Sequence, residues 1–224
     1  MFNVVLLEPE IPGNTENIGR TCVCTGTKLH LIDPLGFKLD KKNTRAGLDY
    51  WERVEYERYV NFVEFVCMNG LLDSVKLDGE YLKKYEYIVE EWTGSQAHPY
   101  ESNEAHPYEN EGAHIVRPYG EGAHIVRPYN NKPNIYFLTT KGHKKYTDVK
   151  FNDGDFLMFG KESAGIPEEI LSLNEDKCIR IPMMKGERSL NLANSVNIVL
   201  YEALRQNDFL NLEGKGELHR LKYV

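Results

Sequence analysis

Apolar residues along the chain fall into short continuous runs, bounded by polar or glycine-containing segments. Continuous runs of four or so apolar residues are typical of strands that are buried on both faces of a parallel sheet. Strands are therefore predicted over Val4–Leu7, Leu29–Ile32, Ile135–Leu138, Phe156–Phe159 and Ile179–Ile181.

Helical spacing fills the segments between these runs. The first helix is expected to begin near Asn14 or Thr15, which are good cap residues, and to end at Gly26. A second is predicted over residues 59–68, with Val60, Val63 and Cys67 on one face. The last helix has apolar residues at helical spacing, namely Leu192, Val196, Val199, Leu200 and Ala203. Strands alternating with helices predict an α/β fold, a parallel sheet flanked by helices on both faces.

Residues 71–131 interrupt this pattern. The nonapeptide Glu-Gly-Ala-His-Ile-Val-Arg-Pro-Tyr occurs at 111–119 and again at 121–129, and Ala-His-Pro-Tyr-Glu occurs at 97–101 and 105–109. The prolines argue against long helices there. We expect an acidic insertion in a single domain formed by 1–70 and 132–207, with 208–224 as a C-terminal tail. The insertion is expected to contain a short helix, from the spacing of Tyr81, Tyr85, Ile88 and Trp92, followed by a repetitive loop.

Charge is concentrated in the same insertion. The 224 residues carry a net charge of −7, but 71–131 holds 11 acids and 5 bases, so the remainder, with 23 acids and 22 bases, is at −1. A near-neutral body can carry a basic face, so a nucleic-acid partner is not excluded. No apolar run approaches the ~20 residues of a membrane helix. The first residues lack the features of a signal peptide, and the four cysteines show no metal spacing, which favours reduced thiols and a cytoplasmic protein.

Several common functional motifs are absent. The chain lacks the phosphate loop of NTPases, G-x-G-x-x-G, H-E-x-x-H and G-x-S-x-G. Asp33, at the end of a predicted strand, fits a turn residue better than a ribose-binding acid. His98, His106, His114 and His124 recur without the cysteine or carboxylate partners typical of zinc sites, so no metal is predicted.

Polar residues cluster after the first predicted strand. Asn14, Asn17 and Arg20 are spaced i, i+3 and i+6 and can share one face at the start of a helix. Two amides and a guanidinium in that position suit a ribose-phosphate ligand. The alternative is a capping role for Asn14 and a solvated Arg20.

Two further clusters follow later strands. Phe159-Gly160-Lys161-Glu162 leads into Gly165 and Pro167, and Gly160 would let a ligand approach the backbone. The segment from Arg180 to Asn194 contains Met183, Arg188 and Ser189, with Ser189 or Asn191 capping the last helix. Lys141–Lys145 forms a basic run. Each also has an interpretation without a ligand. The segment 159–167 is then an ordinary βα turn, Met183 a core methionine, and Lys141–Lys145 a solvated charged face.

Taken in order, these clusters resemble the knotted SPOUT class of RNA methyltransferases, most closely its minimal branch, the bacterial tRNA wobble-nucleotide 2′-O-methyltransferases. The resemblance covers roughly 1–70 and 132–207. It is carried by Glu8–Pro12 with Asn14, Thr15, Asn17 and Arg20; His30–Ile32 with Pro34–Phe37; Arg45–Tyr50; Leu138–Gly142; Phe159–Glu162 with Gly165 and Pro167; and Arg180–Met183 with Arg188–Leu192.

The resemblance implies a C-terminal trefoil knot, a homodimer, and transfer of a methyl group from S-adenosylmethionine to the ribose 2′-OH of the wobble nucleotide, C or U at position 34 of tRNA. It implies a cofactor site at Leu138, Thr139, Gly160, Ile181, Met183, Ser189 and Leu190. Arg20 matches the catalytic arginine. RNA contacts are implied for Asn14, Asn17, Arg45, Lys141 and Arg188.

Two departures leave alternatives open. Glu16 stands where the family usually has glycine, and a carboxylate there would repel phosphate unless it points away or pairs with Arg20. The insertion at 71–131 has no recognised counterpart. A catalytically impaired RNA-binding protein of the same fold and an engineered scaffold carrying an inserted peptide are the alternatives, with an unrelated small-molecule enzyme as a third.

Overall fold

The computed structural model describes residues 1–39, 50–83, 114–116, 124–126, 132–217 and 220. Within them, one parallel sheet has the strand order β3-β2-β1-β8-β6-β9-β7. Its strands are β1 (Asn3–Leu7), β2 (Lys28–Ile32), β3 (Tyr56–Tyr59), β6 (Ile135–Leu138), β7 (Lys144–Lys145), β8 (Phe156–Phe159) and β9 (Cys178–Arg180). The predicted parallel α/β architecture is confirmed.

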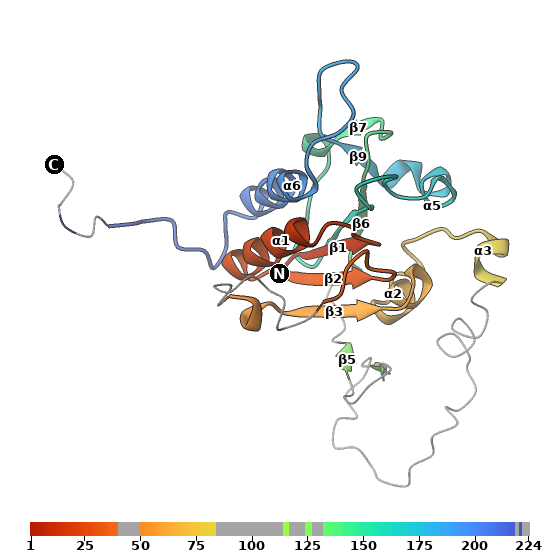
Figure 1. Ribbon diagram of the computed structural model, residues 1–224, viewed down its shortest axis with the longest axis horizontal. Coiled ribbons are helices and arrows are strands. Elements are labelled where there is room, and N and C mark those ends of the chain that lie inside the picture. Colours follow the sequence, from red (N-terminus) through yellow and green to blue (C-terminus); the bar gives the residue numbers. More distant parts are fainter. Residues whose placement is uncertain (40–49, 84–113, 117–123, 127–131, 218–219, 221–224) are drawn as a thin grey trace, which may run out of the picture.

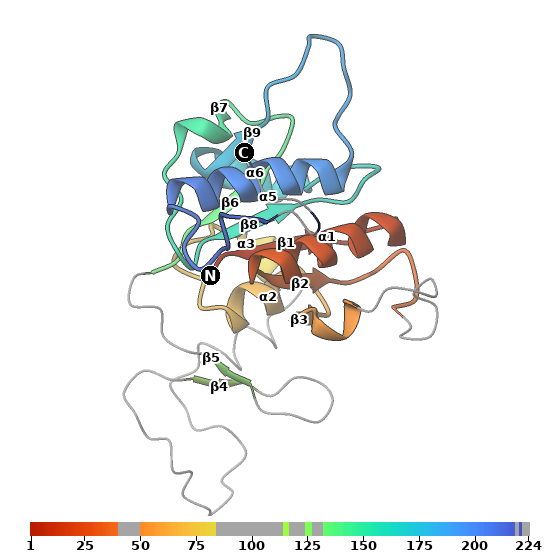
Figure 2. The ribbon, with the colours of Figure 1, turned by 90° about the vertical axis from the view of Figure 1, so that its left-hand side faces the viewer.

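Helices cover both faces of this sheet (Figure 1). On one face α1 (Pro12–Thr25) and α6 (Leu192–Gln206) lie side by side, as Figures 1 and 2 both show, and pack on a core that includes Leu6, Leu31 and Phe159. On the other face α2 (Phe62–Met68) and α5 (Glu168–Leu173) cover a second core. Alternate residues of each buried strand serve the two cores, which explains why the strands are apolar throughout.

The shorter elements complete the described chain. They are the 3-10 turns η1 (Trp51–Arg53), η2 (Tyr146–Asp148) and η3 (Glu175–Lys177), helix α3 (Gly79–Lys83), and strands β4 (His114–Val116) and β5 (His124–Val126). None of the described helices is both long and apolar enough to span a bilayer. All four cysteines are free thiols.

Two predicted boundaries are wrong. The helix expected over 59–68 begins only at Phe62, because Asn61 caps it by accepting a hydrogen bond from Glu64 N at 2.9 Å. Tyr59 instead ends strand β3, and Val60, expected on the buried face, is 52% exposed. The last strand is Cys178–Arg180 rather than Ile179–Ile181, since Ile181 already belongs to the segment leading to Pro182.

The insertion contains more strand than expected. The His-Ile-Val triplets of the two nonapeptide repeats pair as the antiparallel strands β4 and β5, where a loop was predicted. The β-branched Ile and Val of each triplet favour that extended backbone. The helix predicted from Tyr81 onward is present as α3, which is described to Lys83, and Tyr85, Ile88 and Trp92 lie outside the described residues.

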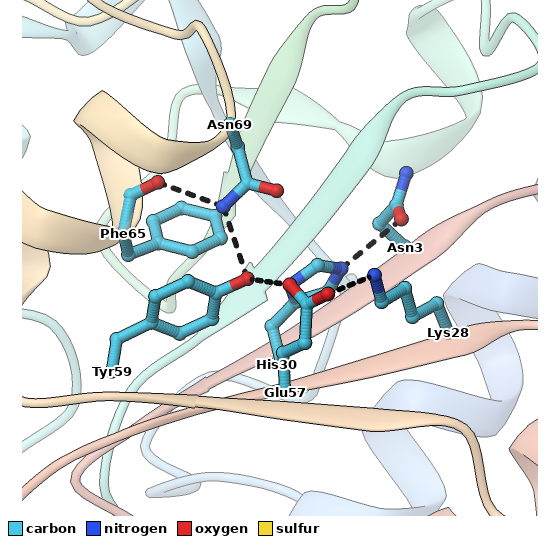
Figure 3. Close-up of polar contacts among 7 residues, drawn as sticks. All are labelled: Asn3, Lys28, His30, Glu57, Tyr59, Phe65 and Asn69. Atoms are coloured by element: carbon cyan, nitrogen blue, oxygen red, sulfur yellow. Dashed lines mark hydrogen bonds and ion pairs between the residues drawn. The ribbon is translucent and has the colours of Figure 1, made fainter. Parts of the chain in front are cut away.

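A buried polar network fixes the register of β1, β2 and β3 (Figure 3). His30 Nδ1 lies 2.7 Å from the Tyr59 hydroxyl, and His30 Nε2 lies 3.1 Å from Asn3 Oδ1. Tyr59 also donates to Glu57, whose other oxygen accepts from Lys28 Nζ at 2.6 Å. Burial favours the neutral form of Glu57, but the hydrogen bonds from Lys28 and Tyr59 outweigh it and lower its pKa.

His30 should make folding sensitive to mild acid. Burial, aided by the Lys28 charge, lowers the pKa of His30 to about 3, against about 6.5 in an unfolded chain. As pH falls below about 6.5 the unfolded chain therefore binds a proton that the folded chain does not, and stability declines. Between about pH 7.5 and 5.5 this contributes a loss of about 1.4 kcal/mol. Urea unfolding of the wild type and of His30→Gln at both pH values measures it. An equal pH dependence in the two proteins would contradict the assignment.

Candidate active site

The loops that follow β6, β8 and β9 surround one cavity at the carboxyl ends of these strands. The three strands are neighbours in the sheet, so their loops emerge side by side, as expected for ligand sites of open parallel sheets. The cavity has a volume of about 480 Å³, within the range of pockets that bind small molecules.

All residues predicted to bind a cofactor line this cavity. They are Leu138, Thr139, Gly160, Ile181, Met183, Ser189 and Leu190. Of the residues predicted to bind RNA, Asn14, Lys141 and Arg188 also line it, whereas Asn17 does not. Arg45 lies outside the described residues. Three loops that are distant in sequence are thus brought together, as the resemblance implies.

The β6 loop is fixed against β9 by backbone contacts. Thr139 N donates to Ile179 O at 2.9 Å. A Cβ on Gly142 would lie 2.9 Å from the carbonyl carbon of Ile179, so only glycine allows this approach. Lys141, at the cavity wall, pairs with Glu168 of α5.

The β8 loop folds back on itself at Gly160. Gly165 N donates to Lys161 O at 2.8 Å, and a Cβ on Gly160 would lie 2.1 Å from the carbonyl carbon of Gly165. The sequence assigned Gly160 to the close approach of a ligand. The structure shows that the chain's own backbone makes that approach, which alone requires glycine here.

Glu162 joins the β8 loop to the start of α1. Its carboxylate accepts from Glu10 N at 2.8 Å, from Ile11 N at 3.4 Å and from Asn14 Nδ2 at 2.8 Å. Asn14 Oδ1 accepts from Asn191 Nδ2 at 2.9 Å, which links the same cluster to the cap of α6. A carboxylate beside a helix N-terminus is favoured by the helix dipole.

Two further polar contacts support this junction. Lys161 Nζ pairs with Glu8 at 2.8 Å, and this pairing raises the pKa of Lys161. Glu10 accepts from the Ser163 hydroxyl at 2.8 Å and from Ser163 N at 2.9 Å, and these hydrogen bonds lower the pKa of Glu10. The β1 loop and the β8 loop are therefore joined at three adjacent positions.

These contacts correct the expected start of α1. The helix begins at Pro12, with Ile11 as its cap residue, rather than at Asn14 or Thr15. Proline suits the first helical position, and Glu162 accepts from the backbone N–H groups of Glu10 and Ile11, which precede the helix. Asn14 is therefore not the cap, although Gly26 ends the helix as predicted.

The three residues expected to share a face of α1 are in different environments. Asn14 is buried and occupied by Glu162 and Asn191, whereas Asn17 and Arg20 are exposed. Arg20 does not line the cavity. It lies six residues beyond Asn14, about 9 Å further along the helix axis. Within the described residues, no ion pair joins Arg20 to Glu16, so that expected way of neutralising Glu16 is not present.

Asp33 is a turn residue, as its position predicts. It follows β2 and accepts from Arg58 Nε at 2.9 Å. The sequence does not predict the roles of Glu162 and Lys161 at this junction. Glu162 belongs to a predicted loop motif, and its position after a strand end, in a loop rich in small residues, is the one feature that indicates a role.

Glu162→Gln should destabilise the junction. The glutamine amide would direct N–H groups at a donor, either Glu10 N or the Asn14 amide, and would remove the charge at the helix N-terminus. Because Glu162 is partly exposed, we expect a loss of about 1–2 kcal/mol in the free energy of unfolding. Glu169→Gln, in the exposed first turn of α5, is the matched control and should change stability by less than about 0.5 kcal/mol. Equal effects in urea unfolding would contradict the assigned role.

The cavity wall suits a ligand held by backbone and apolar groups. Leu138, Ile181 and Met183 supply apolar surface, and Lys141 and Arg188 supply positive charge. The one carboxylate in the lining, Glu162, is occupied by backbone and amide donors, and the lining contains no histidine. A lining of this kind suits the binding and orientation of reactants.

Curated relatives match nearly the whole chain. The tRNA (cytidine(34)-2′-O)-methyltransferase of Methylovorus glucosotrophus is 36% identical over 211 residues, covering 93% of this chain and 97% of the relative. The enzyme of the same name from Escherichia coli K12 is 35% identical over 208 residues, covering 92% and 94%.

Solved structures share the fold. One, described as giving structural insights into the 2-OH methylation of C/U34 on tRNA, is 30% identical with a TM-score of 0.60, covering 93% of this chain and 97% of that one. The SpoU methyltransferase AviRb from Streptomyces viridochromogenes, in complex with AdoMet, has a TM-score of 0.54 at 20% identity, covering 92% and 57%. A profile of the SpoU rRNA Methylase family matches residues 1–75 and 112–201. Because this profile covers well over half of the chain, the chain belongs to the SpoU rRNA methylase family.

Proposed function

We propose that the protein transfers a methyl group from S-adenosylmethionine to the ribose 2′-OH of the wobble nucleotide, C or U at position 34, of tRNA. The observation that carries this proposal is the single cavity formed by the three loops after β6, β8 and β9. Relatives that match more than nine-tenths of the chain bear the name of this activity.

The cavity fits the cofactor in size and chemistry. S-adenosylmethionine, when bound, supplies an electrophilic methyl group on a sulfonium. A volume of about 480 Å³ accommodates a ligand of that size. We propose that backbone groups of Leu138, Gly160, Ile181 and Ser189 hold it, with Thr139, Met183 and Leu190 beside them.

The protein's contribution is to place the ribose hydroxyl in line with that methyl. Orientation of this kind can supply about 7–11 kcal/mol of the barrier. A guanidinium is a poor base at neutral pH. Since Arg20 lies along α1 beyond the cavity lining, we propose that it binds the neighbouring phosphate and the nucleophilic ribose hydroxyl, and that this phosphate assists removal of the hydroxyl proton.

Other RNA contacts are proposed for exposed side chains. Asn17 shares the exposed surface of α1 with Arg20, and Lys141 and Arg188 stand at the cavity. Arg45 is proposed from the resemblance alone. The amide nitrogen and the amide oxygen of Asn14 are both hydrogen-bonded within the chain. We therefore propose that Asn14 fixes the start of α1 rather than binding RNA.

We propose a homodimer and a trefoil knot for the C-terminal part. Exposed apolar side chains on and before α6 support the dimer: Leu190 is 41%, Ile198 37% and Tyr201 47% exposed. Family membership supports the knot. Light scattering should give the mass of two chains, and the mass of one chain would contradict the dimer.

We also propose that 71–131 is an insertion in one domain made of 1–70 and 132–207, with 208–224 as a tail. The family profile supports this, because its unmatched stretch, 76–111, falls inside the insertion. Deletion of 84–131, which keeps the buried Leu71 and Val75, should leave folding and methyl transfer intact, and loss of folding would contradict the division.

The decisive experiment is incubation with labelled S-adenosylmethionine and bulk tRNA, followed by nucleoside analysis. We expect label in a 2′-O-methylated nucleoside from position 34. Label on a base or at another position would overturn the assignment.

Glu16 favours one alternative, an RNA-binding protein of this fold with impaired catalysis, because its carboxylate is not neutralised by Arg20. Equilibrium binding of S-adenosylmethionine distinguishes an active methyltransferase from this alternative, since a protein without catalysis has no need of the cofactor. Tight cofactor binding together with methyl transfer would exclude this alternative.

A further inference from the structure

Arg20 is held by an aromatic ring rather than by a carboxylate. Its guanidinium carbon lies 5.8 Å from the centroid of the Tyr50 ring. Two other exposed arginines are paired with carboxylates: Arg58 with Asp33 at 2.9 Å and Arg205 with Glu202 at 2.8 Å. Within the described part of the chain, no ion pair involves Arg20.

Tyr50 is itself firmly placed. It is 6% exposed, and its hydroxyl donates to the backbone oxygen of Glu16 at 3.1 Å, one helical turn before Arg20. This hydrogen bond therefore fixes the Tyr50 ring against the turn of α1 that carries the Arg20 guanidinium. Because this contact is to the backbone, it does not depend on which side chain stands at position 16.

The next residue, Trp51, packs against the same helix. A Cβ on Gly19 would lie 2.5 Å from Trp51 Cζ3, so glycine lets the indole pack directly against α1. Trp51 is 7% exposed and belongs to the core shared with α1 and α6. The pair Tyr50–Trp51 therefore connects the Arg20 turn to the rigid core.

We propose that Tyr50 is a positioning residue that presents Arg20 to an RNA phosphate. An aromatic face attracts a guanidinium without cancelling its charge. A carboxylate partner would hold the same side chain but would compete with the phosphate. The proposal rests on the proposed function for the identity of the phosphate ligand, and on the Tyr50–Arg20 contact for its geometry.

The functional test compares Tyr50→Leu with Tyr50→Phe. Removing the ring should weaken tRNA binding and raise KM for tRNA about three- to fivefold, while the Kd for S-adenosylmethionine stays within about twofold. Tyr50→Phe keeps the ring and should restore most of the tRNA affinity. Tyr136→Leu is the matched control, because the Tyr136 hydroxyl also donates to a backbone oxygen, and within the described residues no arginine lies over its ring.

A double-mutant cycle separates positioning from a general loss of structure. Adding Tyr50→Leu to Arg20→Ala should not weaken tRNA binding further, because the cation that the ring holds is gone. The same weakening in both backgrounds would overturn the proposal. So would a loss of cofactor binding equal to the loss of tRNA binding, or an equal loss of tRNA binding in Tyr136→Leu.

A spectroscopic measurement tests the contact without tRNA. In NMR spectra, ring current should shift the Arg20 Hδ and Nε–H resonances relative to those of Arg205. The shift should persist in Tyr50→Phe and vanish in Tyr50→Leu. Unshifted resonances in the wild type would overturn the proposal even if methyl transfer is confirmed. A clear shift without any methyl transfer would instead refute the proposed function alone.

Discussion

Arg20→Ala is expected to reduce methyl transfer to tRNA by at least about 10²-fold, the usual loss when one charged or hydrogen-bonding group at a transition state is removed. Binding of S-adenosylmethionine should survive, because Arg20 does not line the cavity. Folding should survive as well, because Arg20 is exposed and its described contact is the Tyr50 ring. Single-turnover methylation and equilibrium cofactor binding measure the two effects separately.

Two variants sharpen this result. Arg20→Lys keeps the charge but loses the planar, bidentate donor set, so it should recover only part of the activity. Arg205→Ala removes an exposed arginine that is already paired with Glu202 and should leave activity near that of the wild type. Loss of cofactor binding in Arg20→Ala, with RNA chemistry intact, would contradict the role proposed for Arg20.

Gly160→Ala is expected to give the largest structural effect. The new Cβ would lie 2.1 Å from the carbonyl carbon of Gly165 and 2.2 Å from Ile166 N, and both are backbone atoms. The β8 loop must therefore open. We expect a loss of about 2 kcal/mol or more in the free energy of unfolding, and at least about tenfold weaker cofactor binding, equivalent to about 1.4 kcal/mol.

Gly13→Ala is the matched control for stability. A Cβ there has no neighbour within 4 Å, and alanine favours the helical backbone at this position by up to about 1 kcal/mol. Urea unfolding should show this variant at or above wild-type stability. A similar stability of Gly160→Ala and the wild type would mean that the close backbone approach at Gly160 is not required.

Sequence alone predicts most of the sheet but not its margins. Val4–Leu7 and Phe156–Phe159 are visible because buried parallel strands are apolar at every position. Strand β3, with the sequence Tyr-Glu-Arg-Tyr, is invisible by that criterion because it lies at the sheet edge and carries charged residues. Its pairing with β2, rather than its composition, makes it a strand.

The cavity proposed for the cofactor could be predicted only through the resemblance. Gly160 and Ile181 stand at predicted strand ends, but nothing in their local sequence says that β8, β6 and β9 are neighbours. The contacts of Glu162 with Glu10 and Asn14 join residues about 150 positions apart. Local propensity does not reflect such contacts, so the predicted start of α1 lies two to three residues after the observed one.

The carboxylate of Glu162 at the start of α1 has a consequence for how anions are discriminated. That helix end, which would otherwise attract phosphate, already has a carboxylate of the same chain beside it. The nucleic-acid backbone must then be recognised by exposed cationic side chains, each of which displaces condensed counterions when it binds. Affinity for tRNA should therefore fall steeply as ionic strength rises, while the affinity for a small ligand in the cavity changes little.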